Sequence, residues 1–250
     1  MYMTETAPAM TLPPIVLVHG AWGGAWIWRR VLAPLRAAGH EVHAVTLTGD
    51  GERAHLRRPD IKLQTHVADV LGLVQAEELD GIVLVGHSYG GQVITGVADR
   101  LQAGRAGAVR HLIYVDAVVP LPGEGWGQQH DPAVVASRTA LAAANDGALP
   151  PVDPADFGLA GADREWLLRR QVPHPFGPYR DPLDFDLARW QALRRSFIDC
   201  TQPAFPTIAP SRLRVRELPG FALRELRTGH CAMVSSAPEL ASLLLELVRE

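Results

Sequence analysis

Short apolar runs alternate with helix-length segments through the first half of the chain, and this rhythm limits the folds that the chain can adopt. Four runs rich in β-branched residues are expected to be strands, at 15–18, 42–47, 82–85 and 112–115. The segments expected to be helices lie between them, at 25–38, 65–78 and 91–102. Strands that alternate with helices of this length form a parallel sheet with helices on both faces. The sequence therefore predicts an α/β fold with a doubly wound, mostly parallel sheet.

The rhythm stops after residue 118 and resumes near residue 191. Residues 119–190 are rich in proline, glycine and aspartate and contain helical patches at 133–144 and 163–170. Because long loops without secondary structure are rare in compact domains, we expect a helical cap here, inserted before the penultimate strand. The last two strands are expected at 197–200 and 222–226, and an amphipathic helix at 238–248. Residues 1–118 and 191–250 would then form the core of a single domain.

The composition is that of an ordinary soluble globular protein. It is 47% hydrophobic and 20% charged with a formal net charge of -3, which argues against partners such as nucleic acid or an anionic membrane. A local cluster of Arg212, Arg214 and Arg216 is interpreted as a solvated face. No apolar run is long enough to span a bilayer, and residues 1–14 lack the pattern of a secretory signal, so the predicted location is the cytoplasm. The two cysteines, Cys200 and Cys231, lack metal-ligand spacing and are expected to be partly buried thiols without a metal.

The stretch from Gly86 to Gly91, Gly-His-Ser-Tyr-Gly-Gly, lies where an expected strand ends and a helix begins. In this context Gly-x-Ser-x-Gly forms a nucleophile elbow, a turn so tight that the serine is strained and its hydroxyl is exposed. A three-position pattern can also arise by chance in a glycine-rich chain. The matching strand and helix on either side favour Ser88 as a nucleophile.

A serine nucleophile needs a neighbouring base, and His230 is the best placed of the ten histidines. It follows the last expected strand, whose end lies at the same sheet edge as Ser88; the alternative is an ordinary loop histidine. The turn after His19 could aim backbone amides at a developing oxyanion, so we assign the oxyanion hole to Ala21 and Tyr89. His19 itself is expected to shape this turn.

These motifs together resemble the α/β-hydrolase superfamily. The residues that carry the resemblance are Val18-His19-Gly20-Ala21-Trp22, the elbow, Tyr114-Val115-Asp116-Ala117 and Gly229-His230. The spacing from Gly20 to Trp26, with Ala37-Ala38-Gly39-His40, looks like the branch of plant methylesterases, hydroxynitrile lyases and their bacterial esterase relatives. The resemblance implies a hydrolase that needs no cofactor. Hydroxynitrile lyases carry a lysine after the catalytic histidine, whereas this chain has Cys231, which argues against cyanide chemistry.

The acid of the expected triad has two candidates. The branch usually places its aspartate at a position that falls near Gln202 or Pro203, where this chain has no carboxylate. Asp116 ends the expected strand at 112–115 in a setting similar to the acid of pancreatic-type lipases, and Asp199 lies in the next strand. Both strands end at the same sheet edge. We favour Asp116 and keep Asp199 as the alternative, while a purely structural role for Asp116 also stays open.

Six aromatic residues in loops or the expected cap could wall an apolar pocket over Ser88, although several are expected simply to pack the cap. They are Trp22, Trp126, Trp166, Phe176, Tyr179 and Trp190. The predicted reaction is hydrolysis of a small-molecule carboxylic ester with an apolar or aromatic acyl group, by a monomer or homodimer. Lactone or thioester hydrolysis, a lyase or rearrangement step, and a receptor with little turnover are the alternatives.

Overall fold

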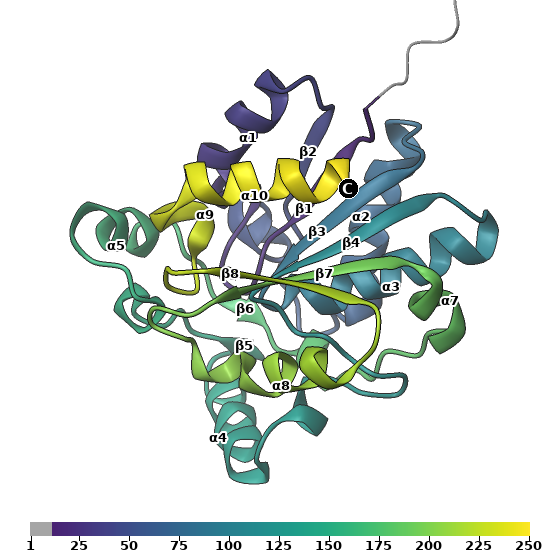
Figure 1. Ribbon diagram of the computed structural model, residues 1–250. Coiled ribbons are helices and arrows are strands. Elements are labelled where there is room, and N and C mark those ends of the chain that lie inside the picture. Colours follow the sequence, from purple (N-terminus) through teal and green to yellow (C-terminus); the bar gives the residue numbers. More distant parts are fainter. Residues whose placement is uncertain (1–11) are drawn as a thin grey trace, which may run out of the picture.

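Buried apolar runs build the central sheet, as expected for strands covered on both faces. The computed structural model describes residues 12–250, and its main sheet has six parallel strands in the order β2-β1-β3-β4-β7-β8 (Figure 1). The strands are β1 (Ile15–Val18), β2 (Val42–Val45), β3 (Ile82–His87), β4 (Val109–Val115), β7 (Arg194–Cys200) and β8 (Phe221–Leu226). β1 and β3 are buried along their whole lengths.

Helices cover both faces of this sheet. α1 packs against α10 on one face, while α2 packs against α3, and α3 against β3 and β4, on the other (Figure 1). The helices outside residues 119–190 are α1 (Arg29–Ala37), α2 (Leu63–Ala76), α3 (Gly90–Gly104), α8 (Ala209–Glu217), α9 (Ala232–Ser235) and α10 (Ala237–Arg249). Short 3₁₀ turns are η1 (Ala25–Trp28), η2 (Gly51–Leu56) and η5 (Pro206–Ile208). The α/β fold with its parallel sheet is thus as the sequence predicts.

Residues 119–190, called the cap segment below, connect β4 to β7. The segment contains η3 (Trp126–Gln129), α4 (Pro132–Ala143), η4 (Pro154–Phe157), α5 (Gly161–Leu168), α6 (Gly177–Arg180) and the start of α7 (Leu187–Ala192). It also contains an antiparallel pair, β5 (Ala148–Leu149) and β6 (His174–Pro175), which the sequence did not predict. α4 projects at the bottom of Figure 1 and α5 at the left. The division of the chain into a core and a cap remains our interpretation.

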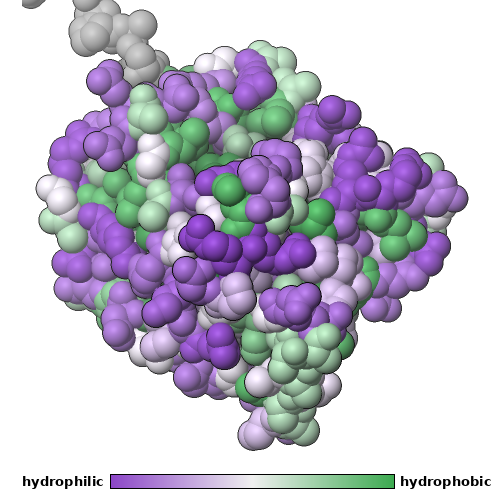
Figure 2. All heavy atoms as spheres, turned by 180° about the vertical axis from the view of Figure 1, so that it is seen from behind, coloured by the Kyte–Doolittle hydropathy of each residue, from purple (hydrophilic) through white to green (hydrophobic). Residues whose placement is uncertain are grey.

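The surface of α4 is unusually apolar for a projecting helix. Val134 and Leu141 are 44% and 40% exposed, and the pale green area at the bottom of Figure 2 is this helix. Asp131 begins the helix by accepting a hydrogen bond from the amide of Ala133 at 2.7 Å. No helix within residues 12–250 is long and apolar enough to cross a membrane.

Several elements differ in length from the expected ones, and charged residues explain two of the differences. β7 begins at Arg194, three residues before the expected start, because Arg195 is buried with its guanidinium over the rings of Trp190 and Phe221. β4 begins at Val109 and includes the exposed Arg110. The helix expected at 25–38 starts as the 3₁₀ turn η1 and becomes α-helical only at Arg29.

Candidate active site

The turn between β3 and α3 holds Ser88 in the left-handed region, at φ 54°. This region is rare for residues other than glycine and is strained. The strain is held by hydrogen bonds: the carbonyl of Ser88 accepts from the amides of Val118 at 2.9 Å and Gly91 at 3.2 Å. The strained conformation expected of an elbow serine is therefore present, and the tertiary structure maintains it.

Three glycines allow the backbone segments around Ser88 to approach one another. A Cβ atom on Gly86 would lie 2.7 Å from the carbonyl oxygen of Gly90, and one on Gly90 would lie 2.7 Å from that of His19. A Cβ on Gly20 would lie 2.7 Å from the Cβ of Ser88. Because real Cβ atoms do not come this close to other heavy atoms, the turn after β1, the end of β3 and the start of α3 can meet only at glycine.

The amides assigned to the oxyanion hole come from two neighbouring turns. Ala21 follows β1 and Tyr89 follows Ser88, and neither amide donates to an acceptor within residues 12–250. His19 holds the first turn: its Nδ1 donates to the carbonyl of Gly20 at 2.6 Å, and its Nε2 accepts from the amide of Leu47 at 3.1 Å. Burial lowers the pKa of His19, consistent with a neutral ring that braces the turn.

His230 and Asp116 meet over the carboxyl ends of the strands. His230 Nδ1 donates to Asp116 Oδ2 at 2.7 Å, and both side chains are buried. Asp116 follows β4 directly and lies at φ 42°, a second strained residue beside Ser88. With Nδ1 occupied as a donor, the Nε2 atom of His230 is free to accept a proton.

Asp199, the alternative acid, does not contact His230. Its Oδ1 accepts from Arg212 Nε at 2.6 Å and its Oδ2 from Arg216 Nη2 at 2.7 Å. Arg212 Nη2 in turn donates to Asp116 Oδ1 at 2.6 Å. The guanidinium of Arg212 thus lies between two carboxylates that end neighbouring strands.

The interpretation of the arginine cluster on α8 as a solvated face is wrong for Arg212 and Arg214, whereas Arg216 is exposed as expected. Arg212 is 9% exposed, and it also donates to the carbonyls of Phe205 and Cys200. Arg214 forms an ion pair with Glu124 in the cap segment at 2.6 Å. The local charge pattern of α8 shows no sign of this, because the partners come from β4, β7 and the cap segment.

A second histidine contacts His230 and was missed by the sequence analysis. His87, the last residue of β3, donates from Nε2 to the backbone carbonyl of His230 at 2.9 Å, with ring centroids 4.5 Å apart. Burial, followed by the nearby His230, holds the pKa of His87 well below its usual range. The backbone of His230 is also held from the cap segment, since its amide donates to the carbonyl of Phe157 at 3.1 Å. The position of His87 next to Ser88 in the elbow was the available signal.

The side chain of Tyr89 is fixed by a buried polar network. Tyr89 Oη donates to His66 Nδ1 at 2.8 Å, and His66 Nε2 donates to the carbonyl of Thr48 at 2.9 Å. Nearby, His174 Nδ1 on β6 donates to Asp50 at 2.9 Å. Burial raises the pKa of Asp50 to about 7 and lowers that of His174 to about 3 and that of His66 to about 4. His174 also packs its ring edge-on against that of Tyr89, with centroids 4.9 Å apart, so the cap segment contacts the residue whose amide we assign to the oxyanion hole.

Two small cavities adjoin Ser88. One of about 20 Å³ is lined by Ala21, Trp22, Ser88, Phe157 and His230, among others. The other, of about 30 Å³ and called the cap-side cavity below, has as its lining residues Trp22, Ser88, Trp126, Arg138, Leu149, Tyr179, Phe205 and Thr207. Trp126 and Tyr179 also wall an outer chamber of about 550 Å³, which reaches Phe176 and Arg180. The side chains of Trp126 and Tyr179 therefore separate the outer chamber from Ser88.

The predicted pocket residues fall in different places. Trp22 lines both small cavities, Trp126 lines the cap-side cavity, and Phe176 lines only the outer chamber. Trp166 lines none of these spaces, because its ring packs edge-on against Trp26 with centroids 5.1 Å apart. Trp190 is a core residue that donates to Tyr114 Oη at 3.0 Å. For Trp166 and Trp190 the expectation of a pocket wall is wrong.

Both cysteines are more buried than expected. Cys200 is 0% and Cys231 2% exposed, and both thiols are free. Burial raises the pKa of each thiol, so neither has the character of a nucleophile. In the described part of the chain, no cluster of three histidine, cysteine, aspartate or glutamate side chains is arranged to hold a metal ion.

Comparisons with known proteins agree with this architecture. Residues 15–243 match the family model described as alpha/beta hydrolase family. A carbendazim hydrolyzing esterase of Nocardioides sp. is 39% identical over 246 residues, which cover 93% of this chain and 98% of that protein. Methylesterase 7 of Arabidopsis thaliana is 25% identical over 93% of this chain and 95% of its own length. A solved extracellular alpha/beta-hydrolase from a Paenibacillus species has a TM-score of 0.80 at 21% identity, covering 95% of this chain and 100% of that one. The resemblance to plant methylesterases and bacterial esterases is confirmed.

Proposed function

The chain belongs to the alpha/beta hydrolase family, and from this premise we propose that it cleaves a carboxylic ester through an acyl-enzyme formed on Ser88. It is an enzyme of the esterase type, like the relative that it matches along nearly its whole length. The observation that carries the mechanism is the 2.7 Å hydrogen bond from His230 Nδ1 to Asp116, formed by a histidine that lines the same cavity as the strained Ser88.

The first half of the proposed reaction forms the acyl-enzyme. His230 Nε2 takes the proton of the Ser88 hydroxyl while Ser88 Oγ bonds to the ester carbonyl carbon. The amides of Ala21 and Tyr89 donate to the oxyanion, and Asp116 stabilises the imidazolium of His230. The tetrahedral intermediate then collapses, the bond to the alcohol oxygen breaks, and His230 returns its proton to the departing alcohol.

The second half repeats these steps with water. His230 Nε2 accepts a proton from water as the water oxygen attacks the acyl carbon, and the same amides hold the oxyanion. Collapse breaks the bond to Ser88 Oγ, which regains its proton from His230. The net reaction consumes one ester and one water and yields one acid and one alcohol, and it requires no cofactor.

Arg212 supports this assignment because it gives the buried Asp116 a permanent counter-charge. An arginine stays protonated in proteins, and a buried carboxylate is costly unless it is paired. Asp116 has a hydrogen-bond donor for each oxygen, Arg212 on Oδ1 and His230 on Oδ2. This arrangement pairs both oxygens of the carboxylate and fixes the one that orients His230.

The proposed substrate has an apolar or aromatic acyl group, because aromatic and aliphatic side chains together make up most of the walls near Ser88. Carbendazim, after which the Nocardioides relative is named, is a first compound to test. Lactones and thioesters belong in the same panel, since the same residues would cleave them. Cys231 replaces the lysine of hydroxynitrile lyases, so cyanide release is not part of the proposal. The cytoplasmic location and the monomeric or homodimeric state stay predictions.

The test is intact-protein mass spectrometry after treatment with a small fluorophosphonate. We expect one adduct on the wild-type protein, none on Ser88→Ala, and one on the control Ser242→Ala, which removes an exposed serine of α10. Ser88→Ala should also lose hydrolysis of activated esters. An adduct that survives in Ser88→Ala, or full esterase activity in that variant, would refute the proposal. A wild-type protein that takes no adduct and releases a tightly bound ligand unchanged would favour the receptor alternative.

A further inference from the structure

Two hydrogen-bond donors in the wall of the cap-side cavity have no acceptor. Within residues 12–250, the Arg138 guanidinium forms neither a hydrogen bond nor an ion pair, and the indole N–H of Trp126 is buried without a partner. Trp22, by contrast, donates from its indole nitrogen to the carbonyl of Leu149 at 3.0 Å. Arg138 is half-buried and lines the cavity, and no group within residues 12–250 occupies its donors, so the guanidinium is available to a ligand that brings acceptors.

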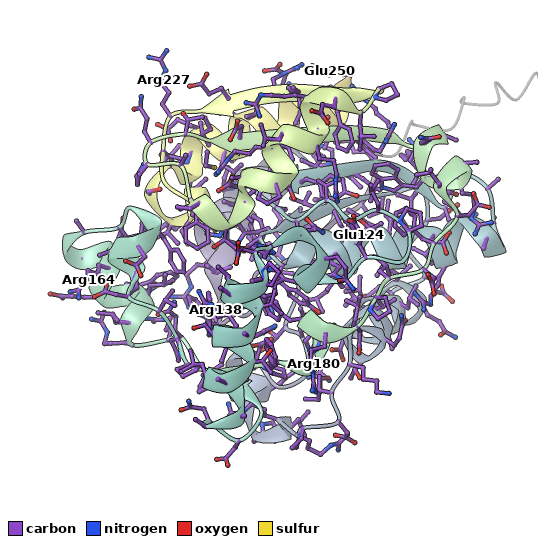
Figure 3. All side chains as sticks on the ribbon, turned by 90° about the horizontal axis from the view of Figure 1, so that it is seen from below. Glu124, Arg138, Arg164, Arg180, Arg227 and Glu250 are labelled. Atoms are coloured by element: carbon purple, nitrogen blue, oxygen red, sulfur yellow. The ribbon has the colours of Figure 1, made fainter. Side chains whose placement is uncertain are left out.

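The charged residues that line this cavity and the outer chamber are all cations. Its lining contains no aspartate or glutamate, and neither does the lining of the outer chamber, where Arg180 adds a second cation. Arg138 comes from α4 and Arg180 from α6, and both are labelled in Figure 3. An anion in the cap-side cavity would therefore meet a cation and no carboxylate among the lining residues, while the buried Asp50 acts on Tyr179 from outside the lining.

The surroundings of Arg138 strengthen its attraction for an anion. The guanidinium is partly buried, and Trp22, Trp126 and Phe205 replace water along the wall. Coulombic attraction grows as the local dielectric constant falls. Tyr179 reports the proximity of this charge, since burial raises the pKa of its phenol well above its usual range and Arg138 partly opposes that rise.

The size of the cavity suggests which anion fits. Its volume of about 30 Å³ has room for about two water-sized groups, which matches the two oxygens of one carboxylate. A planar guanidinium also pairs well with a carboxylate, because two parallel N–H donors meet two oxygens. Ser88 lines the same cavity, so the bound carboxylate would belong to a molecule whose ester group reaches the nucleophile.

We propose that Arg138 is a specificity residue, and that the preferred substrate is an ester that carries a second, free carboxylate bound by Arg138 in the cap-side cavity. The inference rests on the proposed function, because it names the substrate class of the same site.

The test compares two aromatic methyl esters of nearly the same shape. Monomethyl isophthalate carries a carboxylate meta to the ester, and methyl 3-carbamoylbenzoate carries a neutral amide there. We expect wild-type kcat/KM to be higher for the carboxylate by about tenfold, mainly through KM, because a charge-assisted pair forms only with that ester. Arg138→Met should bring the ratio close to one, Arg138→Lys should restore part of it, and added salt should reduce it in the wild type.

The matched control is Arg169→Met, which removes one positive charge from an exposed position of the cap segment that lines none of these cavities. It should keep the wild-type preference, so a loss in Arg138→Met alone would trace to Arg138. Competitive inhibition by isophthalate, weaker in Arg138→Met than in the wild type, checks binding without turnover.

The two proposals fail in different ways. Wild-type enzyme that is labelled on Ser88 and hydrolyses both esters equally would overturn the role of Arg138 and leave the esterase proposal standing. The same conclusion follows if Arg138→Met slows both esters by one factor, since a merely structural role has that effect. A protein that is neither labelled nor active on either ester would overturn the proposed function, and the substrate class with it.

Discussion

Replacing Asp116 with asparagine should reverse the tautomer of His230. In the Asp116→Asn variant, Arg212 Nη2 can pair only with the amide oxygen, because the guanidinium has donors alone. The amide NH₂ then faces His230 Nδ1, which must accept instead of donate. The proton of the neutral ring moves to Nε2, which can no longer take the proton of Ser88.

The expected loss is large. A triad that holds its histidine in the wrong tautomer loses about 10⁴-fold in kcat, with the geometry otherwise kept. Asp199→Asn is the matched control, since Asp199 pairs with Arg212 and Arg216 but does not contact His230. That variant should keep kcat within about threefold. It should lose about 1–3 kcal/mol in the free energy of unfolding, from a weakened buried ion-pair network.

The assay measures kcat on an activated ester, with active enzyme counted by fluorophosphonate titration, together with the melting temperature of each variant. For a chain of this length, about 1 kcal/mol corresponds to about 2–4 °C. We expect Asp116→Asn to lose turnover and Asp199→Asn to lose mainly stability. Near-normal kcat in Asp116→Asn, or an equal loss in both variants, would refute the reasoning.

The remaining predictions concern the pH dependence of stability, the elbow and the thiols. Burial lowers the pKa of His66 from 6.5 to about 4 in the folded protein. As the pH falls below 6.5, His66 is therefore protonated in the unfolded chain before it is protonated in the folded one. The free energy of unfolding should decrease between pH 6.5 and pH 4, by up to about 1.4 kcal/mol per pH unit. The melting temperature should fall across that window, and His66→Gln should flatten the fall; an unchanged slope would contradict this. Gly90→Ala should destabilise the fold by about 2 kcal/mol or more, because the new Cβ lies 2.7–2.8 Å from two backbone oxygens, and an unaltered melting temperature would count against the packing described for the elbow. Cys200 and Cys231 should resist iodoacetamide at pH 8 in the native protein and react in denaturant, as mass spectrometry would show; rapid native labelling would mean that the site opens readily.

Local sequence patterns were enough to predict the sheet and the elbow. The run Ile15–Val18 is apolar at every position and bounded by Pro14 and Gly20, which favours a strand covered on both faces, and the glycines around Ser88 favour a tight turn. These features depend on residues close together in the chain. The extra strand pair β5–β6 was missed because each strand has two residues, too few to show a periodic pattern.

The arrangement of charges at the site did not follow from local patterns. Arg212 lies in a stretch of α8 whose alternating arginines are typical of a solvated face, yet it is buried between Asp116 and Asp199. Local patterns also failed for two other residues. His87 contacts His230 although the sequence did not indicate it, and Trp166 packs away from the cavities although a pocket wall was predicted. Each outcome depends on a partner far away in the sequence.

The sequence by itself therefore determined the α/β fold, the position of the elbow and the short set of residues from which a triad could be drawn. The tertiary structure alone decided that Asp116 rather than Asp199 contacts His230, and that Arg212 donates hydrogen bonds to both carboxylates. The physical reason is that strand and turn formation depend on neighbouring residues. Hydrogen bonds and ion pairs instead depend on distances of about 3 Å between side chains that only the folded backbone brings together.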